Sequence, residues 1–310
     1  MERRNFIKQA AGGILLAGAA GMAAEAAASP SPQSRASNSA KFTLKYAPSL
    51  GMFREHAGKD PIDHLRFIAD QGFRAAYDLG MIGRPPEEQE KIAGEARRLG
   101  LELGQFSFKI DWSGCTFVLN SADIKEMLKT KMLAGLEVQK RTGIRKGLVV
   151  PGHYDAKLHP EYQTANVIEN LRMCLDIIGP HGLEIVLEPL NTLTNHPGLF
   201  LTRTTQAKMI CVAVGRHGCK LVDDLYHQQV TEGNLIPNLE ACWEYIGSIH
   251  VGDNPGRNEP TTGEINYSTI FRYLHERHYD DVISLEHGQS RPGKEGERAI
   301  IDAYREVDPH

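Results

Sequence analysis

Four apolar segments in the second half of the chain each carry a side chain that can bind a metal ion. These side chains are, in order, Glu188, Asp224, His250 and Glu286. A carboxylate at the end of an apolar segment such as 183–188 or 282–286 is costly to desolvate unless a cation neutralises it. One imidazole and three carboxylates form an oxygen-rich set that suits Mn²⁺ or Mg²⁺, with Co²⁺ and Zn²⁺ as further candidates. The four residues therefore predict a site for one divalent ion; the alternative is separate structural residues whose carboxylates pair with arginines.

The segments that must position these residues alternate along the chain in a regular way. Short apolar segments are followed by longer segments of helical periodicity, an order typical of a parallel sheet wrapped by helices. The pattern predicts strands over 42–47, 74–78, 101–106, 146–151, 183–188, 219–223, 248–252 and 282–286. It predicts helices over 61–71, 86–99, 122–142, 160–178, 203–215, 235–245, 268–278 and 295–304. Eight of each is the number that a closed (β/α)8 barrel requires.

Proline and glycine mark the ends of these helices. Prolines stand near the starts of three helices, where a missing amide donor costs little, and glycines follow several helix ends, where a left-handed residue is needed. The prolines are Pro61, Pro86 and Pro160, and the glycines are Gly72, Gly100, Gly143, Gly182 and Gly215. No Gly-x-Gly-x-x-Gly loop follows the first strand, so an open dinucleotide-binding sheet has little support. The predicted fold is α/β, a single TIM barrel over residues 41–310.

In such a barrel the carboxyl ends of the strands converge on the catalytic face. Glu188, Asp224, His250 and Glu286 all lie at or near strand ends, so we expect them to meet there although they are far apart in the sequence. The longer loops 107–121, 189–201 and 253–265 follow strands and are expected to form the same face.

The first 40 residues are expected to lie outside the barrel. Arg3 and Arg4 precede Phe6-Ile7-Lys8 and a stretch rich in Ala, Gly and Leu, which is typical of a twin-arginine export signal over residues 1–28. Residues 29–40 are rich in Ser, Pro and Ala and predict a flexible linker. The apolar stretch is too short for a stable membrane anchor. We therefore expect a periplasmic or secreted protein.

Composition narrows the classes further. The chain has 310 residues, 41% of them hydrophobic and 24% charged, with a net charge of −4. This is enough apolar material for a large core, and the acidic balance without a basic run makes nucleic acid an unexpected partner. The five cysteines are odd in number and match no zinc-binding spacing, so most are expected to be small buried residues.

Several ordered strings of residues carry a resemblance to a known family. They are 187–191, 224–227, 232–235, 250–260, 263–267 and 285–286. Together they resemble the hydroxypyruvate isomerase group of the xylose isomerase-like barrels, which also include the ketose 3-epimerases. The resemblance runs from about residue 46 to residue 304 and is strongest from 224 to 267.

The resemblance implies roles for individual residues. Glu188 and Glu286 match the family's two catalytic glutamates, which also bind the metal, and Asp224 and His250 match the remaining ligands. His227 matches a substrate-binding histidine, and Arg257 matches an arginine that holds a substrate hydroxyl or carboxylate. His153 and Lys109, which follow the fourth and third predicted strands, are expected to contact substrate from the same face. Trp112 is a weaker candidate of the same kind.

Two departures from the family pattern leave the substrate open. Some hydroxypyruvate isomerases carry Gln where this chain has His250, whereas the epimerases carry His, and relatives often carry Glu where this chain has Tyr77. Members of the superfamily are commonly oligomeric, so a homo-oligomer is compatible with the resemblance.

The expected function is a metal-dependent isomerase or epimerase of a small hydroxy-ketone, keto-acid or sugar. The two glutamates would act as acid and base through an ene-diolate. The first alternative is a metal-dependent lyase or dehydratase on a keto-sugar or keto-glycoside, and the second is a noncatalytic sugar-binding barrel. An apurinic endonuclease with three zinc ions is disfavoured by the small number of ligands and the acidic net charge.

Overall fold

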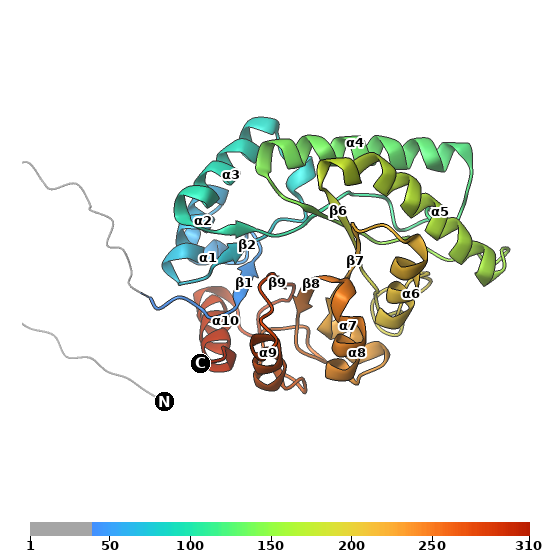
Figure 1. Ribbon diagram of the computed structural model, residues 1–310. Coiled ribbons are helices and arrows are strands. Elements are labelled where there is room, and N and C mark those ends of the chain that lie inside the picture. Colours follow the sequence, from blue (N-terminus) through green and yellow to red (C-terminus); the bar gives the residue numbers. More distant parts are fainter. Residues whose placement is uncertain (1–38) are drawn as a thin grey trace, which may run out of the picture. The chain divides into compact units, whose positions relative to one another are not determined.

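The computed structural model describes residues 39–310, with strands at the centre and helices around them (Figure 1). The strands are β1 (Lys45–Pro48), β2 (Ala75–Ala76), β3 (Glu102–Leu103), β4 (Phe106–Ser107), β5 (Lys146–Val149), β6 (Glu184–Leu187), β7 (Cys219–Asp224), β8 (Ile246–Val251) and β9 (Val282–Leu285). The α-helices are α1 (Arg54–Ala57), α2 (Pro61–Asp70), α3 (Pro86–Leu99), α4 (Ala122–Thr142), α5 (Pro160–Ile178), α6 (Thr204–Val214), α7 (Leu225–Thr231), α8 (Leu235–Cys242), α9 (Tyr267–Glu276) and α10 (Gly293–Val307). Short 3-10 helices cover Met81–Gly83, Gly179–His181 and Trp243–Tyr245. The predicted export signal and all but the last two residues of the predicted linker lie outside the described residues and stay predictions.

The strands pair in parallel and close into a barrel. Seven of them are ordered β1-β9-β8-β7-β6-β5-β4, and β2 pairs with β3. The gap between β1 and β2 is bridged at Tyr77, whose backbone N–H donates to Pro48 O at 3.1 Å and whose carbonyl accepts from Leu50 N at 3.0 Å. On the other side, β3 and β4 are separated only by Gly104 and Gln105. The predicted TIM-barrel fold is therefore confirmed.

The third predicted strand, 101–106, is wrong in one respect, because it is broken into β3 and β4. Residues Glu102 and Leu103 pair with β2, while Phe106 and Ser107 pair with β5. The pairing partner changes at Gly104 and Gln105, so the segment cannot hydrogen-bond as one continuous strand. The break leaves Gln105 in the barrel interior between two pieces of strand.

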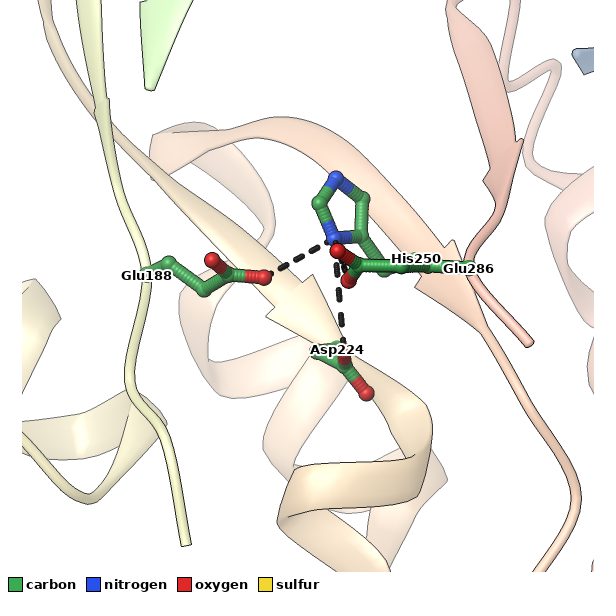
Figure 2. Close-up of side chains that lie close together, drawn as sticks. All are labelled: Glu188, Asp224, His250 and Glu286. Atoms are coloured by element: carbon green, nitrogen blue, oxygen red, sulfur yellow. Dashed lines mark hydrogen bonds and ion pairs between the residues drawn. The ribbon is translucent and has the colours of Figure 1, made fainter. Parts of the chain in front are cut away.

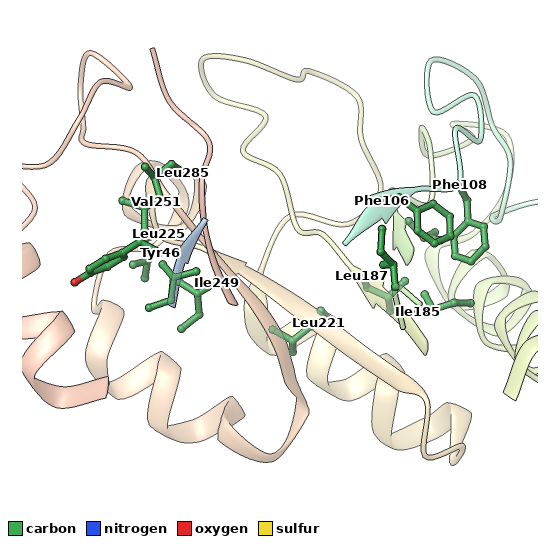
Figure 3. Packing of buried hydrophobic residues seen from close by; sticks show 14 of the residues in the cluster. Tyr46, Phe106, Phe108, Ile185, Leu187, Leu221, Leu225, Ile249, Val251 and Leu285 are labelled. Carbon is green, nitrogen blue, oxygen red and sulfur yellow. The ribbon is translucent and has the colours of Figure 1, made fainter. Parts of the chain in front are cut away.

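The side-chain alternation of the strands separates two apolar layers. Ile185, Leu187, Leu221, Ile249 and Leu285 belong to the large cluster between the strands and the surrounding helices, part of which Figure 3 shows. A smaller cluster fills part of the barrel interior and contains Leu148, Val150, Val186, Leu190, Leu199 and Val222. Because successive side chains point to opposite faces, Glu188 lies on the same face as Val186, and Asp224 on the same face as Val222.

The four metal-ligand candidates thus point inward as a consequence of strand periodicity. His250 and Glu286 follow the same rule, two residues after the buried Ser248 and Ser284. One residue of register shift would move any of these side chains to the outer layer, so the apolar outer residues also fix the site.

The ring of Phe108 limits the size of two residues that pack against it. Phe108 follows β4 and is fully buried, and a Cβ added at Gly135 in α4 or at Gly147 in β5 would overlap its ring.

We predict that Gly135→Ala lowers the free energy of unfolding by about 1–3 kcal/mol through overpacking. The matched control is Gly94→Ala in α3, where no atom lies within 4 Å of the added Cβ. Removing that helical glycine is expected to stabilise the protein by about 0.5–1 kcal/mol. Urea denaturation measures both effects, and equal stabilisation by the two changes would contradict the packing argument.

All five cysteines are free, and Cys174, Cys211, Cys219 and Cys242 are buried, as expected for small apolar residues. Among residues 39–310 no helix has the length and apolar character that crossing a membrane requires.

Candidate active site

Glu188, Asp224, His250 and Glu286 come together at the carboxyl ends of β6, β7, β8 and β9 (Figure 2). One ligand atom from each residue lies within 4.8 Å of the others. His250 Nδ1 is 2.9 Å from Glu188 Oε1, 2.8 Å from Glu286 Oε2 and 4.0 Å from Asp224 Oδ2. Four residues separated by up to 98 positions in the sequence, from 188 to 286, thus face one small volume.

The backbone at the strand ends holds these side chains in place. Glu188 N donates to Val149 O at 3.1 Å, and Glu286 N donates to Val251 O at 3.0 Å, so both glutamates are still tied to a neighbouring strand. Asp224 is the last residue of β7 and also caps α7, because its Oδ1 accepts from His227 N at 2.9 Å. Its other oxygen, Oδ2, is left to face His250.

The charges of the site fit one divalent cation. Three carboxylates are gathered in a place where Glu188 and Asp224 are almost fully buried. Arg257 offsets one of the three negative charges, since its Nη2 lies 3.2 Å from Asp224 Oδ2 and 3.1 Å from Glu286 Oε2. With His250 neutral, the two remaining negative charges match one divalent ion, since buried charges are costly unless they are paired. The cluster is therefore compatible with a divalent metal site.

The electrostatics of the cluster move the pKa values of its members in different directions. Burial alone disfavours the His250 imidazolium, but Glu286 and Glu188 outweigh burial and raise the pKa of His250 well above its ordinary value. Burial and repulsion by Glu286 raise the pKa of Glu188. Burial acts in the same sense on Glu286, but His250 and Arg257 outweigh it and lower the pKa of Glu286. Two glutamates held at different proton affinities are typical of acid and base pairs.

Arg257 is placed by a tightly hydrogen-bonded loop that follows β8. Its guanidinium lies over the ring of Tyr226, 4.9 Å from the ring centre, and its Nε donates to Glu286 O at 3.2 Å. The loop is organised by the buried Asp253, whose carboxylate accepts from Gly263 N at 2.8 Å and from Ile265 N at 3.0 Å. The residues 250–260 thus form part of a hydrogen-bonded loop that positions Arg257.

His227 presents one N–H group to the site. The backbone N–H of Asn191 donates to His227 Nδ1 at 3.2 Å, so Nδ1 is an acceptor. Burial lowers the pKa of His227 to about 4, so the ring is neutral at pH 7 and its hydrogen is on Nε2. This buried Nε2 has no hydrogen-bond partner and lies 3.8 Å from Asp224 Oδ2. An unpaired donor beside the carboxylates is suited to bind an oxygen atom of a ligand.

His153 and Lys109, the other two predicted substrate contacts, lie against glycines of neighbouring segments. Neither the imidazole of His153 nor the ammonium of Lys109 makes a hydrogen bond or ion pair with the cluster in the described part of the chain. The ring of His153 lies against Gly198, and the Lys109 side chain reaches toward Gly83. Their contact with substrate stays a prediction.

Three residues of the site region were not predicted. Asn191 fixes His227, and His196 lies between rings, with its centre 5.3 Å from that of His227 and 5.2 Å from that of Trp112. Gln105 contacts His250 from below. Asn191 lies in the string 187–191, and Gln105 is a polar residue within the predicted strand 101–106, so each left a weak signal in the sequence.

Comparison with known proteins agrees with this architecture. The sequence model of the xylose isomerase-like TIM barrel matches residues 65–307. The chain is 30% identical to the hydroxypyruvate isomerase of Escherichia coli strain K12 over 181 residues, which cover 58% of this chain and 69% of that protein. It is 29% identical to the 2-oxo-tetronate isomerase of Cupriavidus necator over 253 residues, which cover 78% of this chain and 92% of that protein. Among solved structures, an AP endonuclease, family 2, from Brucella melitensis superposes with a TM-score of 0.72 at 24% identity, covering 82% and 96% of the two chains. At that identity the likeness shows the fold alone.

Proposed function

The chain belongs to the xylose isomerase-like TIM-barrel family, and from that premise we propose that it is a metal-dependent isomerase or epimerase of a small keto-acid or keto-sugar. The observation that carries the proposal is the convergence of Glu188, Asp224, His250 and Glu286 at the carboxyl ends of consecutive strands. The relatives named hydroxypyruvate isomerase and 2-oxo-tetronate isomerase support an isomerisation next to a carbonyl group.

Glu188, Asp224, His250 and Glu286 would hold the metal. A divalent ion at this place supplies Lewis acidity, which makes the hydrogen on the carbon next to a carbonyl group easier to remove. The oxygen-rich donor set favours Mn²⁺ or Mg²⁺ over Co²⁺ or Zn²⁺.

The proton transfers belong to the two glutamates. Glu188 and Glu286 come from the first and the last of the four consecutive strands that carry the cluster, so they approach a substrate between them from different strands. One carboxylate removes the proton next to the carbonyl group and leaves an ene-diolate of the substrate. The other carboxylate then returns a proton. Protonation of the neighbouring carbon moves the carbonyl group and gives an isomer, whereas protonation of the same carbon from the opposite face inverts its configuration and gives an epimer.

His227 and Arg257 hold the substrate in this scheme. The free Nε2–H of His227 donates to a substrate oxygen, and it acts as a fixed donor because the ring is neutral at pH 7. Arg257, already paired with Asp224 and Glu286, donates to a hydroxyl or carboxylate of the substrate.

Exchange of carbon-bound hydrogen with solvent tests the proposal. The protein loaded with Mn²⁺, and separately with Mg²⁺, is incubated in D₂O with hydroxypyruvate, with ketoses and with a keto-glycoside, and proton NMR follows each substrate after the metal is removed. We expect deuterium at the carbon next to the carbonyl group, together with an isomer or epimer of one of these substrates. Release of water or of an aglycone would show a lyase reaction and not an isomerisation. Binding of a substrate without any hydrogen exchange would show a noncatalytic sugar-binding barrel.

A further inference from the structure

A group of buried polar side chains lies inside the barrel beneath the metal-ligand cluster. Gln105 is 1% exposed, Ser248 is 1% exposed and Ser284 is fully buried. Barrel interiors are usually filled by bulky apolar side chains, as they are here on β5, β6 and β7 by Leu148, Val186 and Val222. Polar residues at such positions need a reason, because burying them is costly unless they bond to one another or to a functional group.

The three side chains form one network that ends on His250. Ser248 Oγ and Gln105 Oε1 are 3.0 Å apart, and Ser284 Oγ and Gln105 Nε2 are 3.2 Å apart. The same end of the Gln105 amide contacts Nε2 of His250. Gln105 lies between β3 and β4, 145 residues before His250 in the sequence, so the contact joins two distant parts of the chain.

The contact decides which ring nitrogen of His250 carries hydrogen. His250 Nδ1 faces Glu188 and Glu286, so Nδ1 is the atom that would bind a cation. An imidazole that gives the lone pair of Nδ1 to a metal carries its hydrogen on Nε2, and this hydrogen requires an acceptor. The NH₂ group of a glutamine is no acceptor, but its oxygen is, and the two exchange places when the amide turns over.

The serine hydroxyls allow that orientation without leaving any polar atom unpaired. With Oε1 toward His250, the oxygen accepts from His250 Nε2–H and from the Ser284 hydroxyl, while the NH₂ group donates to Ser248 Oγ. Each hydroxyl can donate or accept, so every polar heavy atom of the network has at least one partner in this arrangement.

We propose that Gln105 is a positioning residue for metal binding, whose amide oxygen accepts the Nε2 hydrogen of His250 and so keeps Nδ1 free to bind the ion. The inference rests on the proposed function, because it assumes a divalent ion at the cluster. Partners of this kind, which fix the tautomer and orientation of a metal-binding histidine, typically change metal affinity by about 10- to 100-fold when removed.

Two substitutions separate this role from packing. Gln105→Met keeps the length of the side chain but has no strong acceptor, whereas Gln105→Glu keeps an acceptor oxygen. We expect Gln105→Met to weaken the binding of Mn²⁺, measured by titration calorimetry, by about 10- to 100-fold, and Gln105→Glu to recover most of that loss. Gln89→Met is the control for losing a buried glutamine, because within residues 39–310 the Gln89 side chain bonds to the carbonyls of Met81 and Arg84 and to Arg141, and none of these belongs to the cluster. It is expected to leave Mn²⁺ affinity unchanged. Circular dichroism and thermal melting show that each variant is folded.

The tautomer itself gives a readout that packing would not move. Protein labelled with ¹⁵N-histidine and loaded with Mg²⁺ is studied by long-range proton–nitrogen NMR, with His250 assigned from a His250→Gln variant. At a Mg²⁺ concentration that saturates the wild-type site but not a site weakened about 10- to 100-fold, we expect the Nε2–H tautomer in the wild-type protein and in Gln105→Glu, and its loss in Gln105→Met.

The inference is overturned if Gln105→Met binds Mn²⁺ as tightly as the wild-type protein, or if Gln105→Met and Gln105→Glu weaken binding equally. Metal binding that depends on Gln105, in a protein that exchanges no carbon-bound hydrogen, would overturn the proposed function and leave this inference standing. A wild-type protein that binds neither Mn²⁺ nor Mg²⁺ would overturn both.

Discussion

Glu188→Gln and Glu286→Gln are each expected to lower kcat by about 10²- to 10⁴-fold while the barrel stays folded, because each change removes one of the two groups proposed to transfer protons. Glutamine keeps the size of the side chain and one carbonyl oxygen for a metal, but it cannot take up a proton at neutral pH. Turnover of the substrate identified by deuterium exchange measures the loss, and thermal melting confirms that each variant is folded.

The same two variants also separate the half-reactions. When one glutamate is lost, the other can still remove a proton on its own side and return one from solvent, so exchange is expected to persist without net conversion. Glu184→Gln is the matched control, because Glu184 is the first residue of β6, whereas Glu188 follows the last residue of that strand. It is expected to leave kcat unchanged. A near-normal rate in Glu188→Gln or Glu286→Gln would remove that residue from proton transfer.

The parts of the fold that the sequence predicted best are those set by local chemistry. Helices α3, α4 and α5 begin and end at the predicted residues. Proline is the first residue of α3 and of α5, Ser121 caps the start of α4, and a glycine follows the last residue of all three helices. Gly100 and Gly143 have the expected positive φ, 69° and 79°. Such signals act over a few residues, so they can be recognised without knowledge of the tertiary structure.

The parts that escaped prediction depend on non-local pairing or are too short to show a period. The break between β3 and β4 follows from the change of partner at Gly104 and Gln105, which no local pattern encodes. Helices α1 and α7 have four and seven residues, at most two turns, and no apolar periodicity can be recognised in so short a segment. In α7 the cap comes from Asp224, which the sequence marked for a different reason.

The candidate site divides in the same way. The strand ends place Glu188, Asp224, His250 and Glu286 on the inner face, since each lies two residues after an inward side chain. Gln105 could not be assigned, because its partner His250 is 145 residues away and a polar residue within a predicted strand has many explanations. His196 escaped prediction for a related reason: its neighbours are Trp112, in the loop after β4, and His227, in helix α7.

Removal of divalent ions is expected to have the other large effect. Dialysis against a chelator should abolish turnover, and Mn²⁺ should restore it, because without a cation His250 is held as an imidazolium by Glu188 and Glu286 and both carboxylates are engaged with it. Elemental analysis of the reloaded protein is expected to find one ion per chain. The triple variant Glu188→Ala, Asp224→Ala, His250→Ala is expected to retain none.

Thermal melting provides a second readout that needs no substrate. An ion that binds only the folded chain at 100 times its Kd adds about 2.7 kcal/mol to the free energy of unfolding. For a barrel of this size that corresponds to a rise in Tm of about 5–10 °C, which the triple variant should not show. If neither the Tm nor the turnover of the wild-type protein changes when chelator or Mn²⁺ is added, the metal site is contradicted. The proposed proton transfer would then also be wrong, because His250 would remain paired with the two carboxylates that must act as bases. A barrel that binds a sugar without catalysis would be the better explanation.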